Sequence, residues 1–99
     1  IIFDEIDTGV SGEIANKIGV MMKDISSSIQ VVTITHLPQV AALGDRHYKV
    51  YKQDTEKETV TRMKELDAES RILEIAGMLS GSQVDSAAIE NAKSLMKNY

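Results

Sequence analysis

The sequence predicts an α/β fold in which a parallel βαβ unit is followed by a β-hairpin and two C-terminal helices. Short apolar runs at residues 1–5 and 30–35 have the character of buried strands and flank a segment with helical periodicity. A connection of this kind places the two strands parallel, with a right-handed crossover. Irregular strand patterns at 47–53 and 58–66, and then apolar residues at helical spacing, complete the order.

The first strand is an apolar run, IIFDE at residues 1–5, that ends abruptly in the two carboxylates of Asp4 and Glu5. The chain begins within this run, without an initiator Met or a preceding loop, so we expect the 99 residues to be a piece of a larger sheet. Open α/β sheets bind their ligands at the carboxyl ends of their strands. Two acids at such an end suggest a metal ion and a water molecule.

A helix and a second strand follow. The apolar spacing predicts that one face of the helix is buried, made of Ile14, Ile18, Met21 or Met22, and Ile25. Three serines at 26–28 end this helix, and the β-branched residues of 30–35 form the strand. His36 ends that strand, and Pro38 turns the chain into a short helical piece through Ala42. Both strand ends therefore open on the same edge of the sheet.

The remaining residues predict a hairpin and two helices. Residues 54–57 form the turn of the hairpin, and Asp67 is the predicted N-cap of the next helix. Gly81 ends that helix, and the last helix begins near Asp85 or Ser86. The buried face of the first of these helices is expected to contain Ile72, Ile75, Ala76 and Leu79. Mixed charges around the hairpin and the helix start, Arg71 among them, are interpreted as a solvated face.

Composition limits the classes of function. A net charge of −4 and a pI near 5.1 argue against a broad DNA-binding face, because phosphate neutralisation needs clustered Lys and Arg. The chain has no cysteine, which excludes disulfides and thiolate metal sites and fits a cytosolic protein. No apolar run approaches the roughly 20 residues that span a bilayer, so we expect no membrane partner.

The acidic strand end and His36 together favour a nucleotide site. Mg²⁺ usually takes one or two carboxylates together with phosphate oxygens and waters, and Asp4 suits that role. Glu5 is expected on the opposite side of the pleat, where it could activate a water for attack on a γ-phosphate. An acidic pair alone is more often a simple strand-to-loop boundary. A histidine at the corresponding end of the neighbouring strand makes the functional interpretation stronger.

These residues carry a resemblance to a known family. Residues 1–5 look like a Walker B strand of ABC-type ATPases, Asp7 matches the form used by the SMC branch, and His36 matches the H-loop histidine. The string FDEIDTGVSG at 3–12, followed by THLPQVA at 35–41, resembles the bacterial RecN family of SMC-like proteins of DNA double-strand-break repair. The resemblance covers essentially all of residues 1–99, as the C-terminal part of a P-loop NTPase head of the ABC type.

The resemblance implies roles for individual residues. Asp4 would help to hold Mg²⁺, usually through water, Glu5 would be the catalytic base for ATP hydrolysis, and His36 would contact the γ-phosphate. A second head would complete an ATP-bound homodimer, and the full-length protein would contact DNA in the cytoplasm, associated with the nucleoid. The D-loop, which touches the partner head in this class, would consist of Asp7, Thr8, Gly9, Val10, Ser11 and Gly12.

Three features depart from a complete site of this class. Many ABC proteins have an Asp where this chain has Ser11, so a cross-dimer contact by that carboxylate is not expected. The sequence lacks the P-loop motif G-x-x-x-x-G-K-[ST], so the chain alone should bind ATP poorly and hydrolyse it negligibly. Residues 79–83, LSGSQ, resemble the ABC signature but follow the H-loop, and we interpret them as a helix end.

Two other functions stay open. The chain could be a non-catalytic domain that binds a protein through an exposed sheet edge. It could also be a metal-dependent nuclease that uses Asp4, Glu5 and Asp7, although His36 and the acidic composition fit a nucleotide site better. His47 has no acidic or cysteine partner at ligand spacing, and we interpret it as a packed or solvated residue.

Overall fold

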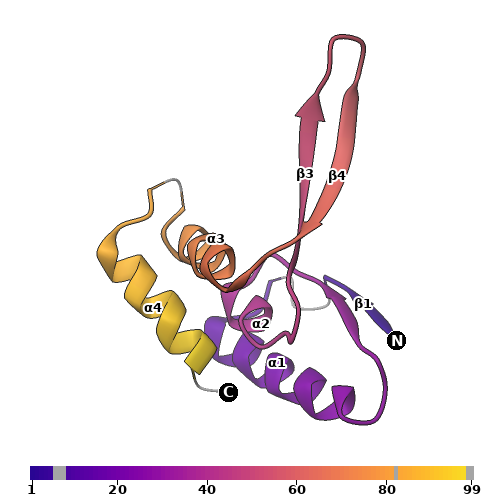
Figure 1. Ribbon diagram of the computed structural model, residues 1–99. Coiled ribbons are helices and arrows are strands. Elements are labelled where there is room, and N and C mark those ends of the chain that lie inside the picture. The colour runs from indigo at the N-terminus through magenta and orange to yellow at the C-terminus, as the bar shows by residue number, and fades with distance from the viewer. Residues whose placement is uncertain (6–8, 82, 98–99) are drawn as a thin grey trace.

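The protein was analysed as a computed structural model that describes residues 1–5, 9–81 and 83–97. Its order of elements confirms the predicted α/β class (Figure 1). The elements are β1 (Ile2–Asp4), α1 (Gly12–Ser26), β2 (Val32–Ile34), α2 (Pro38–Ala41), β3 (Tyr48–Asp54), β4 (Thr59–Glu65), α3 (Ala68–Ser80) and α4 (Ser86–Lys97).

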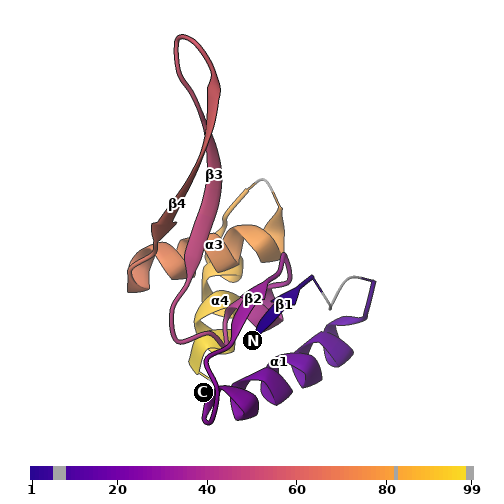
Figure 2. The same cartoon turned by 90° about the vertical axis from the view of Figure 1, so that its right-hand side faces the viewer.

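The two N-terminal strands form a parallel pair whose register aligns Ile2 with Val32 and Asp4 with Ile34. Figure 2 shows them side by side, with α1 below them. Phe3 points from this pair into the core beside α1, whereas Ile2, Val32 and Ile34 are exposed. The second strand stops early because the Thr35 hydroxyl accepts a hydrogen bond from the Leu37 N–H, at 3.0 Å, and turns the chain toward α2.

Helix α1 ends at the serines that the sequence predicts, but its buried face is different. Its buried residues are Ala15, Gly19 and Met22, while Ile14 and Met21 are 43% and 49% exposed. The predicted face was therefore wrong at Ile14. The cause is the close approach of the segment around α2: a Cβ at position 19 would lie 2.6 Å from Leu43 Cδ1. Only glycine permits this distance, so the small residues of α1 face the core.

Helix α2 lies between two small apolar cores. One core contains Ala15, Met22 and Val40, so it joins α1 to α2. The other core begins with Ala42, the residue after α2, and continues through residues of α3 and α4, namely Ile75, Ala76, Ala88 and Ala92. In Figure 1, α2 accordingly lies between α1 and α3.

The hairpin of β3 and β4 projects away from the helices in both ribbon views (Figures 1 and 2). Its strands pair antiparallel along their whole length, from Tyr48 opposite Glu65 to Asp54 opposite Thr59. The turn is closed by Thr55, whose N–H and hydroxyl both donate to the Glu58 carbonyl, at 2.8 and 2.7 Å. The hairpin thus has its own hydrogen-bonded framework and most of its side chains are exposed.

Both C-terminal helices begin where the sequence predicts, and the first of them ends at the predicted Gly81. The Asp67 carboxylate accepts from the Ser70 N–H at 2.8 Å, and the Asp85 carboxylate accepts from the Ala88 N–H at the same distance. Gly81 ends α3 with a positive φ of 78°. Ile75 and Ala76 are buried as predicted, whereas Leu79, predicted to be buried with them, is 36% exposed. None of the described helices has the length and apolarity needed to cross a membrane.

The close contact at Gly19 leads to a stability prediction. We expect Gly19→Val to lower the free energy of unfolding by about 1–3 kcal/mol, because its branched side chain would overlap buried Leu43. Gly77→Ala is the matched control in another helix, since an added Cβ there would meet only Val84, at 3.9 Å. The control should raise the free energy of unfolding by about 0.5–1 kcal/mol through helix propensity. Urea unfolding measures both, and equal effects at the two glycines would contradict the packing account.

Candidate active site

Glu5 and His36 come together at the carboxyl ends of the parallel strands. The Glu5 N–H donates to the Ile34 carbonyl at 2.8 Å, which extends the parallel ladder one residue beyond β1. His36 lies two residues after the end of β2, and its Nδ1 is 3.7 Å from Glu5 Oε1. Both side chains are more than half exposed, at 62% for His36 and 53% for Glu5. The strand edge therefore presents an imidazole and a carboxylate, side by side, to incoming ligands.

The backbone at Glu5 has an unusual conformation. Its φ is 51°, and among the described residues it is the non-glycine residue with a positive φ. A left-handed conformation costs an ordinary residue roughly 1–2 kcal/mol, and such outliers concentrate at functional sites. The prediction that pleat alternation turns Glu5 to the opposite face assumed an extended residue. That assumption was wrong, because the left-handed backbone, rather than strand alternation, sets the direction of this side chain.

Asp4 is the last residue of β1 and its side chain is exposed. Within the strand it alternates with Phe3, which packs beside α1, so Asp4 belongs to the other face. A single exposed carboxylate at a strand end suits Mg²⁺, which takes its remaining ligands from phosphate oxygens and water. Among residues 1–5, 9–81 and 83–97, no three acidic or histidine side chains converge as a protein-only metal site. Asp4 could therefore hold Mg²⁺ only together with ligands from outside the described residues, such as phosphate oxygens and water.

The segment predicted as the D-loop is described in part. Asp7 and Thr8 lie outside the described residues. Gly9 is exposed, and Val10 packs against the core beside α1. Ser11 is the N-cap of α1, where its hydroxyl accepts from the Ile14 N–H at 3.4 Å. The departure from Asp at this position therefore leaves a capping side chain in place.

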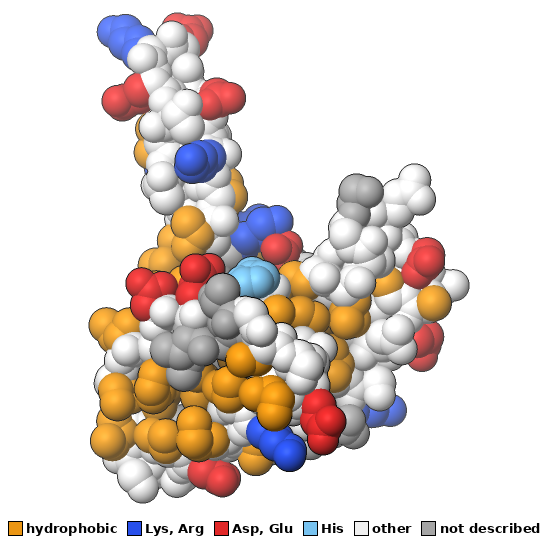
Figure 3. Space-filling model, turned by 180° about the vertical axis from the view of Figure 1, so that it is seen from behind, with side chains coloured by type: hydrophobic (Ala, Val, Ile, Leu, Met, Phe, Trp, Pro, Cys, Tyr) orange, Lys and Arg blue, Asp and Glu red, His pale blue; other side chains and the backbone are white. Residues whose placement is uncertain are grey.

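An open groove of about 840 Å³ lies next to this site. Its lining includes Thr35 and His36 after β2, and Val50 and Met63 of the hairpin, but neither Asp4 nor Glu5. Figure 3 shows the molecule from behind, with exposed apolar side chains gathered over its lower part. The acidic strand end is therefore at the margin of the groove, and His36 is the site residue that belongs to both.

Comparison with known proteins identifies the family. No protein-family model matches the chain. The chain is 48% identical over 96 residues to the DNA repair protein RecN of Rickettsia conorii, and 44% identical over 96 residues to that of Vibrio cholerae. It is 43% identical over 97 residues to the RecN of Bacillus subtilis. These matches cover 97% or 98% of this chain. The chain belongs to the RecN family. It spans 17% or 18% of the length of these relatives.

The match to RecN proteins agrees with the α/β fold described above. The parallel pair, the hairpin and the two C-terminal helices are the elements that the sequence pattern predicted. The signature-like string 79–83 was interpreted as a helix end, and α3 does end within it, at Ser80. Ser82 of this string lies outside the described residues.

Sequence reasoning missed Arg71. It was assigned to a solvated face, but it is partly buried, and its Nη2 donates to the carbonyls of Ala41 and Gly44 at 3.2 and 2.8 Å. The assignment was wrong because those carbonyls are distant in sequence. One signal was present: Arg71 precedes buried Ile75 by four residues, so the two share a helix face.

His47 lies beside Arg71 and is a packed residue, as one of the two interpretations held. Its Nδ1 is buried, without a hydrogen-bond partner among the described residues. Burial lowers the pKa of His47, the positive charge of Arg71 lowers it further, and Glu74 raises it. The folded protein therefore binds a proton at His47 less readily than the unfolded chain does.

This difference predicts a pH dependence of stability. Because the folded pKa of His47 is below its ordinary value of 6.5, the free energy of unfolding should decrease as pH falls below about 6.5. His47→Gln should reduce that decrease, and His36→Gln, at an exposed histidine, should keep it. Asp45 and Asp67 also have lowered pKa values, but their contribution is lost only below their ordinary value of 3.8. Urea unfolding between pH 7.5 and 5.5 measures the effect, and an unchanged slope in His47→Gln would exclude it.

Proposed function

We propose that this chain supplies the base and the γ-phosphate contact of an ATP-hydrolysing head in a DNA repair protein of the RecN family. The observation that carries the proposal is the 3.7 Å approach of His36 Nδ1 to Glu5 Oε1 at the ends of two parallel strands. The position and the type of both residues fit this proposal. An acid that orients water and an imidazole that senses phosphate must both reach the same γ-phosphate, so they must lie close to each other.

Each of the three site residues has a distinct task in this proposal. Glu5 accepts a proton from the water that attacks the γ-phosphorus. His36 donates a hydrogen bond to a γ-phosphate oxygen. Asp4 would hold Mg²⁺, usually through a water molecule, and the metal would supply positive charge beside the phosphate oxygens. Glu5 and His36 together then respond to whether the γ-phosphate is present.

The rest of the site comes from outside these 99 residues. A P-loop, which the sequence lacks, would hold the phosphates, so the isolated chain should hydrolyse ATP negligibly. A second head would contact residues 7–12 in an ATP-bound homodimer. DNA would be bound by other parts of the full-length protein, in the cytoplasm and in association with the nucleoid, since this segment is acidic.

A non-catalytic protein-interaction domain is the second candidate function. It draws support from the exposed apolar residues on one face of the parallel pair, Ile2, Val32 and Ile34. Apolar patches of this kind mark contact surfaces. Such a domain would not need the carboxylate of Glu5, and this difference separates the two functions.

The decisive variant is Glu5→Gln in the full-length protein that carries this chain. We expect kcat for ATP hydrolysis to fall about 100-fold to 10,000-fold, because the amide cannot accept the proton of the attacking water. ATP affinity should change by less than about threefold, since the side chain keeps its size and position. Phosphate release measures the first quantity, and equilibrium binding of labelled ATP measures the second.

Glu13→Gln is the matched control, because Glu13 is an exposed acid in the first turn of α1, where it faces Lys17. It should leave both kcat and ATP affinity unchanged. If Glu5→Gln also left kcat unchanged, Glu5 would not be the base, and the interaction domain would become the better account.

A further inference from the structure

The position of His36 depends on a very short helix. His36 is followed by Leu37, the N-cap of α2, and α2 itself comprises only the four residues Pro38–Ala41. The N-cap has no side-chain hydrogen bond, so the place of α2 depends on its contacts with the neighbouring elements. A single helical turn is not stable by itself in water, and its placement comes from tertiary packing.

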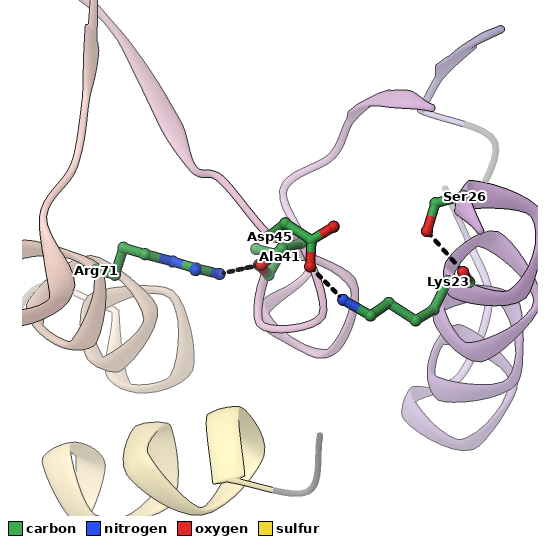
Figure 4. Close-up of polar contacts among 6 residues, drawn as sticks. Lys23, Ser26, Ala41, Asp45 and Arg71 are labelled. Atoms are coloured by element: carbon green, nitrogen blue, oxygen red, sulfur yellow. Dashed lines mark hydrogen bonds and ion pairs between the residues drawn. The ribbon is translucent and has the colours of Figure 1, made fainter. Parts of the chain in front are cut away.

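Arg71 supplies one of these contacts from α3. Its Nη2 donates to the carbonyl of Ala41, the last residue of α2, and to the carbonyl of Gly44, 30 and 27 positions away in sequence. Figure 4 shows the Arg71 side chain reaching from α3 toward Ala41. The carbonyls at the end of a helix lack partners within the helix and carry partial negative charge, so a guanidinium there satisfies them.

Helix α1 holds the same segment from the other side. Lys23 Nζ donates to the Asp45 carboxylate, and this hydrogen bond, together with the charge of Lys23, lowers the pKa of Asp45. In Figure 4 Lys23 and Arg71 approach the segment after α2 from opposite directions. Gly19 of α1 adds the close contact with Leu43. Residues 38–45 are therefore held between α1 and α3. This segment follows closely after His36, the proposed γ-phosphate contact.

We propose that Arg71 is a positioning residue that sets the location of His36 by fixing the end of α2. This inference rests on the proposed function of His36. The planar guanidinium presents several N–H donors in fixed directions and can serve two carbonyls at once, which a single ammonium does less well. Partial burial limits the access of water to the hydrogen bond with Ala41. Loss of Arg71 frees α2 to shift, and His36 moves with it.

A double-mutant cycle in the full-length protein tests the route of action. Arg71→Met should lower kcat by about 10-fold to 100-fold, the order of effect that an ångström-scale misplacement produces. In the His36→Ala background, Arg71→Met should change kcat by less than about twofold, because the residue that it positions is already absent. ATP affinity should change by less than about threefold in each variant. Arg71→Lys should retain an intermediate kcat, since it keeps one charged donor.

Arg62→Met is the matched control, because Arg62 lies on the exposed hairpin and donates to Gln53. It should leave kcat unchanged. If Arg71→Met fails to fold, as judged by its melting temperature, Arg71→Lys replaces it in the cycle. If the fold reduction of kcat in the double variant equalled the product of the two single reductions, the positioning role of Arg71 would be overturned, and the proposed role of His36 would stand. A His36→Ala protein with normal kcat would overturn the proposed role of His36 and the inference with it.

Discussion

The arrangement of this protein depends on the packing of α2 between two separate apolar cores. Val40 belongs to the core shared with α1, and Ala42 belongs to the core shared with α3 and α4. Neither core is large, so neither would fix the relative positions of the N-terminal and C-terminal halves without this joint. The polar contacts of Lys23 and Arg71 reinforce it from the two sides. The single turn of α2 thus packs the parallel strands and α1 on one side against the C-terminal helices on the other.

The candidate site lies at the ends of the two parallel strands, on the N-terminal side of α2. Hydrogen bonding of Glu5 to Ile34 continues the parallel ladder up to the acid itself, so the backbone of Glu5 is held by its neighbour strand. His36 lies after the same neighbour strand and is held at its other side by the turn into α2. The two parallel strands hold Glu5, and β2 together with α2 holds His36. This explains how two exposed side chains of a small protein reach a defined separation.

The sequence was sufficient for features that depend on local chemistry. The strands, the helix starts at Asp67 and Asp85, and the convergence of Glu5 and His36 all follow from residue type and short-range spacing. Features that depend on distant contacts could not be predicted. The rotated face of α1 results from an approach between residues 19 and 43, and Arg71 bonds carbonyls that belong to another element. From the mixed charges around Arg71 the sequence could only predict solvent exposure, because it does not show where the carbonyls of Ala41 and Gly44 lie.

The left-handed backbone of Glu5 sets fold stability against the role proposed for its carboxylate. Glycine at position 5 would adopt a φ of 51° without steric cost and would recover most of the roughly 1–2 kcal/mol that glutamate loses there. It would also remove the carboxylate that faces His36. Selection for thermal stability in a laboratory library would therefore favour glycine at this position. By the role proposed for Glu5, such sequences would lack the base for hydrolysis, so stability and the proposed chemistry call for opposite substitutions.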